Sequence, residues 1–521
     1  MKPTPAKAAI LLWAAIGLAI LLCGALTRGV TYDEDQYIAA GVLTQELMPY
    51  RDFLYLQPPL YPFFLAAIFP FAEGWYVLTA RLVTFGLASV SALLLWHLVR
   101  KLGAGLLLAV ILLTACLASP FLLAPLANAR NDALPLTLML AGLAAHLWAE
   151  DHATSARASS RASSRASFRA DPLANFWRER STRLVAALLM GLAVEAKLSY
   201  LFAPLAIGIH ALFAPRHRLP PVLLGGALAA LPAVWCWFEA PEAFRFGLLD
   251  YHLTAPTDWY TAQGMADLLQ PWSRLVAFTD HAALGGNLTL VILAAALSLL
   301  AMARHRKWKR PGRLLFGLTT GALVFAAVPA PSWAMYFAPV APLLACCIAH
   351  LDRTTTHLAG RARKQVLMVV AALPILPFLA LQLAELPGLL HPDQWVGVAI
   401  HRNARFLRDS LPNRDTEREI ATLFPMFVLE TNPIRPEFAT GPFVFRSAAA
   451  FPPDLLARLH ALSPATLEAA FASSPPDAIY AGRYADAWPI PMDAALADYA
   501  QRHAWPLART DRWGGKLWIR P

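Results

Sequence analysis

Long apolar segments separated by short basic loops constrain this chain more than any other feature. A helix needs about 20 apolar residues to span a membrane, and we expect eleven spans. They lie at about residues 8–27, 76–99, 104–122, 132–149, 184–197, 199–215, 219–237, 286–303, 314–330, 335–351 and 366–384. Only 15% of the 521 residues are charged and 57% are apolar, whereas soluble domains are about 25% charged. The sequence therefore predicts a polytopic α-helical membrane protein.

The basic residues of the loops predict the orientation of the chain. Loops on one side of the membrane hold 23 Lys and Arg residues, and loops on the other side hold five. Basic loops stay in the cytoplasm, so we expect a cytoplasmic N-terminus in the cell inner (plasma) membrane. The first apolar segment is long and lacks a clear small-residue cleavage site, which favours an uncleaved span over a signal peptide.

Because the expected number of spans is odd, the chain after the last span lies on the opposite side of the membrane from the N-terminus. We therefore expect a membrane part, residues 1–384, followed by an extracytoplasmic domain, residues 385–521. The second part contains short β-like runs and one amphipathic helical pattern, which together predict a small α/β domain. The runs lie at 421–429, 478–480 and 517–519, and the helical pattern lies at 492–503.

A low-complexity stretch of Arg, Ser and Ala, residues 153–171, lies in the cytoplasmic loop expected at 150–183. Its composition is typical of a disordered loop whose arginines fix the topology and contact anionic lipid headgroups. A regulatory or binding role is the alternative.

Composition also argues against two other classes of site. The net charge of +10 comes from basic residues beside apolar segments, which indicates membrane orientation and not nucleic-acid binding. The five cysteines all lie in apolar segments without a C-x-x-C pair or a histidine cluster, so no zinc site is predicted.

The first extracytoplasmic loop, residues 28–75, begins with the acids Asp33, Glu34 and Asp35 only a few residues after a span. Carboxylates so close to hydrocarbon are costly and usually functional, although three acids can also mark a solvated loop. The loop continues with aromatic and apolar residues and ends in a rigid Pro-Pro turn before an interfacial segment at 58–71. We expect it to lie on the membrane and to form the wall of a cavity.

Other polar residues recur at the same membrane face. They are Arg81 at the start of the second span, Arg130 and Asp132 between the third and fourth, Lys197 in a short hairpin, and Ser332, Trp333 and Tyr336 between the ninth and tenth. Each alone fits snorkelling or an aromatic belt. Together, acids and cations from separate segments at one depth predict a site for an anionic, lipid-attached substrate.

These residues carry a family resemblance. The loop resembles that of GT-C glycosyltransferases that use polyprenyl-phosphate sugars, above all the protein O-mannosyltransferases and the lipid A aminoarabinose transferases. The matching motifs are, in chain order, Asp33-Glu34, Gln57-Pro58-Pro59-Leu60, Arg81-Leu82, Asp132 with Arg130 nearby, Gly191-Leu192-Ala193 with Lys197, and Tyr336 with Pro339. They cover about residues 8–345, and their order and spacing carry the resemblance.

The chain departs from this pattern at Leu56-Gln57. There the aminoarabinose transferases carry Glu-Lys, whose lysine is expected to hold the donor phosphate. Gln57 has no charge, which argues against an aminoarabinose transferase proper and shifts phosphate binding towards Arg130, Lys197 or Arg81.

The resemblance implies an inverting transfer of a sugar from a polyprenyl-phosphate donor to a hydroxyl of a lipid, glycan or protein. It implies that Asp33 is the base that accepts the proton of the acceptor, with Glu34 orienting it or binding the acceptor. The remaining roles are donor-phosphate binding for Arg130, Lys197 and Arg81, and substrate binding for Gln57, Asp132 and Tyr336. The sequence demands no cofactor, and a divalent metal between the acids stays open.

Two other classes of function compete with this interpretation. A multi-span transporter or lipid flippase would favour internal symmetry between the halves and acids in mid-span, where Glu195 stands nearly alone. A structural subunit that binds partners through its tail gives no reason for the charges gathered at the outer face.

Overall fold

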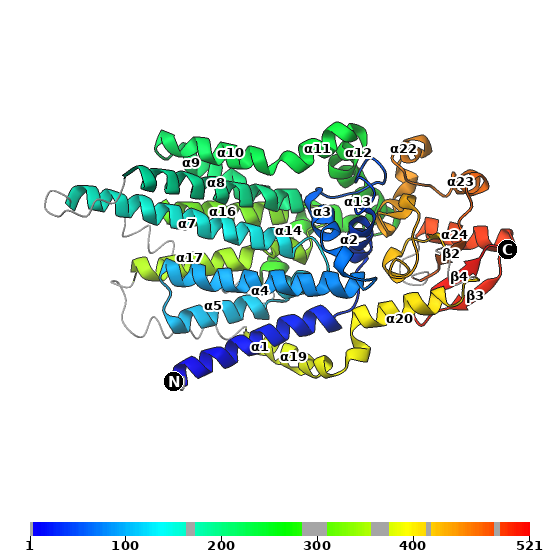
Figure 1. Ribbon diagram of the computed structural model, residues 1–521, viewed down its shortest axis with the longest axis horizontal. Coiled ribbons are helices and arrows are strands. Elements are labelled where there is room, and N and C mark those ends of the chain that lie inside the picture. Colours follow the sequence, from blue (N-terminus) through cyan, green and yellow to red (C-terminus); the bar gives the residue numbers. More distant parts are fainter. Residues whose placement is uncertain (1–3, 163–171, 284–309, 356–374, 413–417, 484–489) are drawn as a thin grey trace.

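A bundle of long helices continues, at one end, into a smaller domain that contains the sheet (Figure 1). This computed structural model describes residues 4–162, 172–283, 310–355, 375–412, 418–483 and 490–521. The helices of the bundle are α1 (Pro5–Thr27), α4 (Tyr76–Leu102), α5 (Leu106–Ala118), α6 (Pro120–Ala127), α7 (Ala133–Ala162), α8 (Pro172–Ala196), α9 (Phe202–Leu212), α10 (Leu219–Ala229), α11 (Leu231–Glu239), α16 (Arg310–Ala327), α17 (Val340–Thr355) and α19 (Ile375–Glu385). The predicted fold class, a polytopic helical membrane protein with a small C-terminal α/β domain, is confirmed.

Most described residues of each predicted apolar segment are helical. Among the described residues, four helices are long and apolar enough to cross a membrane, or six if each of two bent pairs counts as one span. The predicted span at 286–303 and the first half of that at 366–384 lie outside the described residues. The number of eleven spans therefore stays a prediction.

Proline accounts for the two bent pairs. α6 begins at Pro120, and α11 carries Pro232 in its first turn. Proline has no N–H to donate and is best tolerated where a helix starts, so each apolar segment is divided there. The axis of α11 departs by 41° from that of the helix before it. The spans predicted at 104–122 and 219–237 are thus each built from two helices.

The Arg/Ser-rich segment is more helical than its composition indicated. α7 continues to Ala162 and α8 begins at Pro172, while residues 163–171 lie outside the described part. Alanine and arginine are strong helix formers, so both helices extend beyond the apolar spans. The prediction that the stretch 153–171 is disordered is therefore wrong for residues 153–162, which belong to α7.

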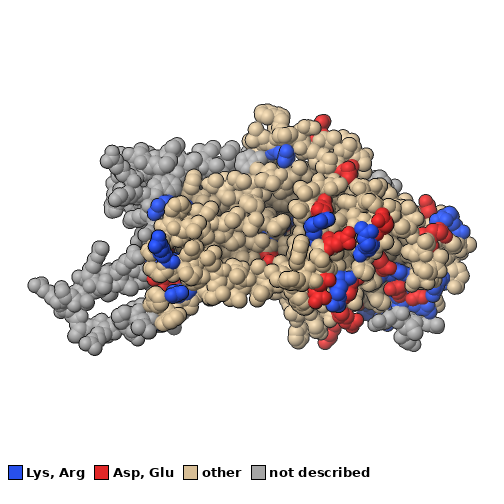
Figure 2. Space-filling view, turned by 90° about the horizontal axis from the view of Figure 1, so that it is seen from above, with Lys and Arg blue, Asp and Glu red and all other residues tan. Residues whose placement is uncertain are grey.

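Charged side chains gather at the ends of the molecule. On the face in Figure 2, acidic and basic residues crowd the end that holds the sheet, and basic residues mark the opposite end of the described surface. The surface between them is almost free of charge. This is the distribution expected of a surface that faces lipid.

The loop between the first two predicted spans, residues 28–75, folds into a largely buried layer. It contains α2 (Tyr32–Leu43), α3 (Leu60–Ala66) and the 3-10 helix η1 (Phe69–Phe71). Tyr50, Phe53 and Tyr55 are at most 1% exposed. α2 packs against α3 on one side and against two C-terminal segments, η10 (Pro425–Phe427) and α21 (Pro442–Phe445), on the other.

A second outer segment completes this layer. It contains α12 (Pro241–Arg245), the π-helix η4 (Phe246–Asp250), α13 (Tyr251–Ala262), η5 (Ala266–Leu269) and α14 (Pro271–Ala283). Tyr251 of α13 donates a hydrogen bond to the carbonyl of Phe443 at 2.9 Å. This contact joins the segment to the C-terminal domain.

The C-terminal domain has a four-stranded sheet of order β1-β2-β4-β3. Its elements include α20 (Val396–Arg408), β1 (Ile420–Ala421), α22 (Pro453–Arg458), α23 (Leu467–Ser473), β2 (Ala478–Ala481), α24 (Pro491–Arg502), β3 (Leu507–Thr510) and β4 (Lys516–Ile519). β1 pairs with β2 in parallel, and β4 pairs antiparallel with both β2 and β3.

The sequence predictions for this domain are confirmed in part. β2, β4 and α24 lie where the patterns placed them. The predicted run at 421–429 is wrong, because β1 ends at Ala421 and Pro425 begins a 3-10 turn. β3 escaped detection because it is an edge strand whose side chains are mostly exposed, which removes the alternating pattern.

A buried glutamate fastens the C-terminal domain to the bundle. Glu430 accepts a hydrogen bond from the Val77 N–H at the start of α4 (3.0 Å), and its other oxygen lies 2.8 Å from His401 Nδ1 of α20. The His401 ring stacks on Trp75 with 3.6 Å between ring centroids. One carboxylate therefore connects three segments that are far apart in the sequence.

We predict that Glu430→Ala lowers the free energy of unfolding by about 1–3 kcal/mol, because it leaves the buried Val77 N–H without an acceptor. Thermal unfolding of the purified protein measures the effect. The exposed acid Asp454, changed to Ala, serves as the control. An unfolding temperature equal to that of the wild type would show that this contact does not fasten the domain.

Candidate functional site

The three acids at the start of α2 point in three directions, because successive residues of a helix are about 100° apart. Asp33 faces a cavity, and its side chain is 24% exposed. Glu34 points into the bundle and Asp35 towards the C-terminal domain, and both are fully buried. Asp35 accepts a hydrogen bond from the Met426 N–H at 3.2 Å. Asp33 is thus the acid of the three that a ligand in the cavity can reach.

Glu34 and Arg81 form a fully buried ion pair. Arg81 donates from Nε and Nη2 to the two oxygens of Glu34 at 2.9 and 2.8 Å. Glu34 also accepts from Asn128 Nδ2 and from the Ala129 N–H, each at 2.9 Å. Burial raises the pKa of Glu34, but Arg81 and these donors lower it by more, so it lies below its ordinary value.

Arg81 also donates hydrogen bonds to backbone carbonyl oxygens that directly follow α1. They reach the carbonyl oxygens of Arg28 at 2.6 Å and of Gly29 at 3.3 Å. Arg81 is 0% exposed and does not line the cavity. This placement argues against direct contact of Arg81 with a donor phosphate and indicates that the pair positions α2.

Four charged side chains form a row that begins in the wall of the cavity and continues behind it. Arg130 forms ion pairs with two carboxylates. It donates a hydrogen bond from Nη1 to Asp33 and another from Nε to Asp132, the second at 2.9 Å. Lys197 bonds the other oxygen of Asp132. Arg130, Asp132 and Lys197 are at most 7% exposed. Because it contains two carboxylates and two cations, this row of four side chains has no net charge.

The structure brings six of the eight predicted site residues together, four that line a cavity and two that lie behind it. Asp33, Gln57, Arg130 and Tyr336 line a cavity of about 440 Å³. Asp132 and Lys197 lie directly behind Arg130, and Lys197 Nζ is 5.8 Å from the centroid of the Tyr336 ring. Glu34 and Arg81 form a separate buried cluster.

Gln57 is held by its neighbours, since its Oε1 accepts from Asn131 Nδ2 and its Nε2 lies near His252 Nε2, both at 3.4 Å.

Several lining residues escaped the sequence analysis. Tyr251, His252 and Tyr260 come from α13, and Phe443 and Arg446 come from the C-terminal domain. The aromatic residues of the stretch 251–260 were a usable signal, because aromatic side chains with a polar tip are common where a site is partly wet. No local pattern marked Phe443 or Arg446.

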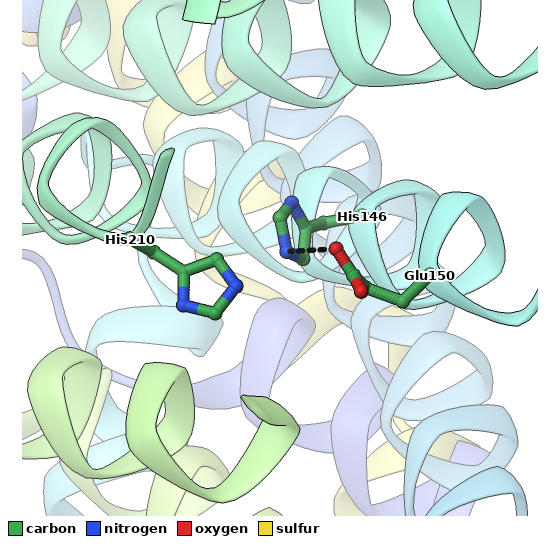
Figure 3. Close-up of side chains that lie close together, drawn as sticks. All are labelled: His146, Glu150 and His210. Carbon is green, nitrogen blue, oxygen red and sulfur yellow. Dashed lines mark ion pairs between the residues drawn. The ribbon is translucent and has the colours of Figure 1, made fainter. Parts of the chain in front are cut away.

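A second cluster of polar side chains, from α7 and α9, lies farther along the bundle (Figure 3). Ligand atoms of His146, Glu150 and His210 lie within 4.8 Å of one another, close enough to be considered for a metal. Glu150 is 18 residues beyond Asp132, which on a helix corresponds to about 27 Å. The cluster is therefore separate from the cavity.

Arginines already occupy the carboxylate of this cluster. Glu150 Oε1 accepts from Arg183 Nη2 at 2.8 Å and from Arg218 Nη1 at 2.7 Å. Two guanidinium groups beside the same oxygen oppose the binding of a dication. We interpret the cluster as a network that joins α7, α8 and the segment before α10.

Comparison with solved structures identifies the fold of this chain. No protein-family model and no curated protein matches the sequence. The structure of ArnT from Cupriavidus metallidurans bound to undecaprenyl phosphate is similar, with a TM-score of 0.60, 12% identity and 98% of each chain covered. Its apo structure also gives a TM-score of 0.60, with 13% identity over 99% of this chain and 98% of that one.

The oligosaccharyltransferase of Archaeoglobus fulgidus in the apo form is also similar. It gives a TM-score of 0.53 and 11% identity, over 94% of this chain and 72% of that chain. Both neighbours are GT-C glycosyltransferases. The chain therefore has the GT-C fold, as the family resemblance implied.

We predict that Glu34→Gln or Arg81→Met alone lowers the free energy of unfolding by about 3–5 kcal/mol, because each leaves a buried charge without its partner. The double variant should lose less than the sum of the two single variants. Thermal unfolding of all three proteins tests this double-mutant cycle. Strictly additive losses would contradict a coupled pair.

Proposed function

We propose that this protein is an integral membrane glycosyltransferase that moves a sugar from a polyprenyl-phosphate donor to a hydroxyl of a lipid, glycan or protein. The observation that carries the proposal is the placement of Asp33, a partly exposed carboxylate, at a cavity of about 440 Å³ in a GT-C fold. A structural neighbour was solved with undecaprenyl phosphate bound, which supports a donor of this class.

The reaction we propose is a single displacement with inversion. Asp33 accepts the proton of the acceptor hydroxyl while its oxygen attacks the anomeric carbon. The bond from that carbon to the phosphate oxygen breaks, and polyprenyl phosphate leaves as an anion. Arg130 fixes the orientation of Asp33, and Lys197 with Asp132 fixes Arg130. Such preorganised charges need little rearrangement during the reaction.

The other lining residues suit a sugar. Tyr260, Trp333 and Tyr336 offer aromatic rings to the apolar faces of a pyranose, and Gln57 offers an amide for its hydroxyl groups. Binding sites typically combine apolar walls with a few placed polar groups. The cavity therefore matches the substrate class in both respects.

The location follows from the charges of the loops. With the basic loops in the cytoplasm, the cavity and the C-terminal domain face the extracytoplasmic side of the inner membrane. The polyprenyl chain would then lie among the membrane helices while its phosphate reaches the cavity. Donor and acceptor would meet outside the cytoplasm.

We predict that Asp33→Asn lowers the rate of transfer by about 10²–10⁴-fold, because asparagine cannot accept the proton. The rate of polyprenyl phosphate release from a polyprenyl-phosphate sugar, in the presence of acceptor, measures the effect. Glu46→Gln is the control, because Glu46 is an exposed acid after α2. A variant Asp33→Asn that folds and turns over like the wild type would exclude Asp33 as the base.

We further predict that Lys197→Met weakens use of the donor more than use of the acceptor. Without Lys197, Asp132 is paired with Arg130 alone, which disturbs the position of Arg130 in the wall of the cavity. Initial rates with each substrate varied should show KM for the donor raised by about tenfold. Lys101→Met, at a lysine paired with Asp151, is the control. Equal effects on both substrates would contradict a role towards the phosphate.

A further inference from the structure

Arg446 is a cation that the C-terminal domain places in the wall of the cavity. It directly follows α21 and lines the cavity together with Phe443, Tyr251 and Tyr260. Its guanidinium carbon lies 4.8 Å from the centroid of the Phe443 ring and 5.7 Å from that of Trp259. Aromatic rings hold a guanidinium in place without neutralising its charge.

Arg446 differs from the other cations near the cavity in its lack of a carboxylate partner within the described part of the chain. Arg130 and Lys197 bond carboxylates, and their chain with Asp33 and Asp132 has no net charge. Among the described residues, no carboxylate lies within 4.0 Å of Arg446, and its buried Nε has no hydrogen-bond partner. Arg446 is therefore the lining cation whose charge is available to a ligand.

The proposed reaction needs such a charge. The donor is a phosphodiester with one negative charge, and the leaving polyprenyl phosphate keeps the electron pair of the broken bond and gains a second one. The proton of the acceptor hydroxyl goes to Asp33, so it does not neutralise the phosphate. The neutral row of acids and cations that begins at Asp33 stabilises this new negative charge only weakly. A cation without a carboxylate partner stabilises it with its full positive charge.

The position of Arg446 also suits a leaving group. In a single displacement, the attacking and leaving oxygens lie on opposite sides of the anomeric carbon, so the base and the phosphate ligand must come from different walls. Asp33 comes from α2 and Arg446 from the C-terminal domain. Burial raises the pKa of the Tyr251 and Tyr260 hydroxyls, Arg446 lowers it and Asp33 raises it. Both charges therefore act on the same two phenols, one from each wall.

We propose that Arg446 binds the phosphate of the polyprenyl-phosphate donor and of the polyprenyl phosphate that leaves. This assignment rests on the proposed function. It gives the C-terminal domain a direct part in the site, and it supplies the positive charge that Gln57 lacks.

Binding of undecaprenyl phosphate to the purified full-length protein, compared with binding of undecaprenol, tests the assignment without any acceptor. The variants are Arg446→Gln and Arg446→Lys. The control is Arg458→Gln, because Arg458 of α22 is an exposed arginine of the same domain, is paired with Glu242 and Asp454, and lies away from the cavity.

We expect Arg446→Gln to bind undecaprenyl phosphate about tenfold or more weakly than the wild type, as loss of a charge-assisted bond would cause. Binding of undecaprenol should not change, and Arg446→Lys should fall between the two. If the glutamine variant does not fold, the lysine variant decides, because it keeps the charge but loses the bidentate fork.

Two results would overturn the assignment. One would refute the role of Arg446 alone, and the other would also refute the proposed donor. Undecaprenyl phosphate binding by Arg446→Gln that equals the wild type would refute the role of Arg446 alone, and would leave Arg446 for an anionic acceptor. A wild-type protein that binds undecaprenyl phosphate no better than undecaprenol would refute the proposed donor class as well.

Discussion

Charges that lie close to hydrocarbon must be neutralised within the protein, and the rest of this structure depends on how that is done. Glu34 and Arg81 are both fully buried, and each is satisfied by the other and by groups from separate segments. A buried charge without its partner costs several kcal/mol, so this pair fixes α2 against α1 and α4. With α2 fixed, Asp33 can only face the cavity.

The same constraint shapes the cavity itself. The chain from Asp33 through Arg130 and Asp132 to Lys197 is complete and neutral without a ligand, which allows these groups to be held in one arrangement. The C-terminal domain, fastened through Glu430, contributes Phe443 and Arg446 to the wall of the cavity. The loop between α1 and α4 supplies Asp33, and a domain outside the bundle supplies the further cation.

Much of this could be predicted from the sequence, because apolar segments and loop charges report directly on membrane spans. The convergence of Asp33, Arg130, Asp132 and Lys197 followed from their shared depth, although their roles remain predictions. The burial of Arg81 could not be predicted, because it depends on carbonyl oxygens at Arg28 and Gly29. The contribution of Arg446 depends on how α21 packs on α2, which no local pattern encodes.

The central claim is that the cavity transfers a sugar from an isoprenoid carrier. The most direct measurement incubates the purified protein with a panel of polyprenyl-phosphate sugars and an extract of envelope lipids and glycans as acceptors, and follows the free polyprenyl phosphate. The account predicts that at least one donor is consumed and that its sugar appears on an acceptor. Intact donors throughout the panel, with protein that is folded and binds polyprenyl phosphate, would contradict it.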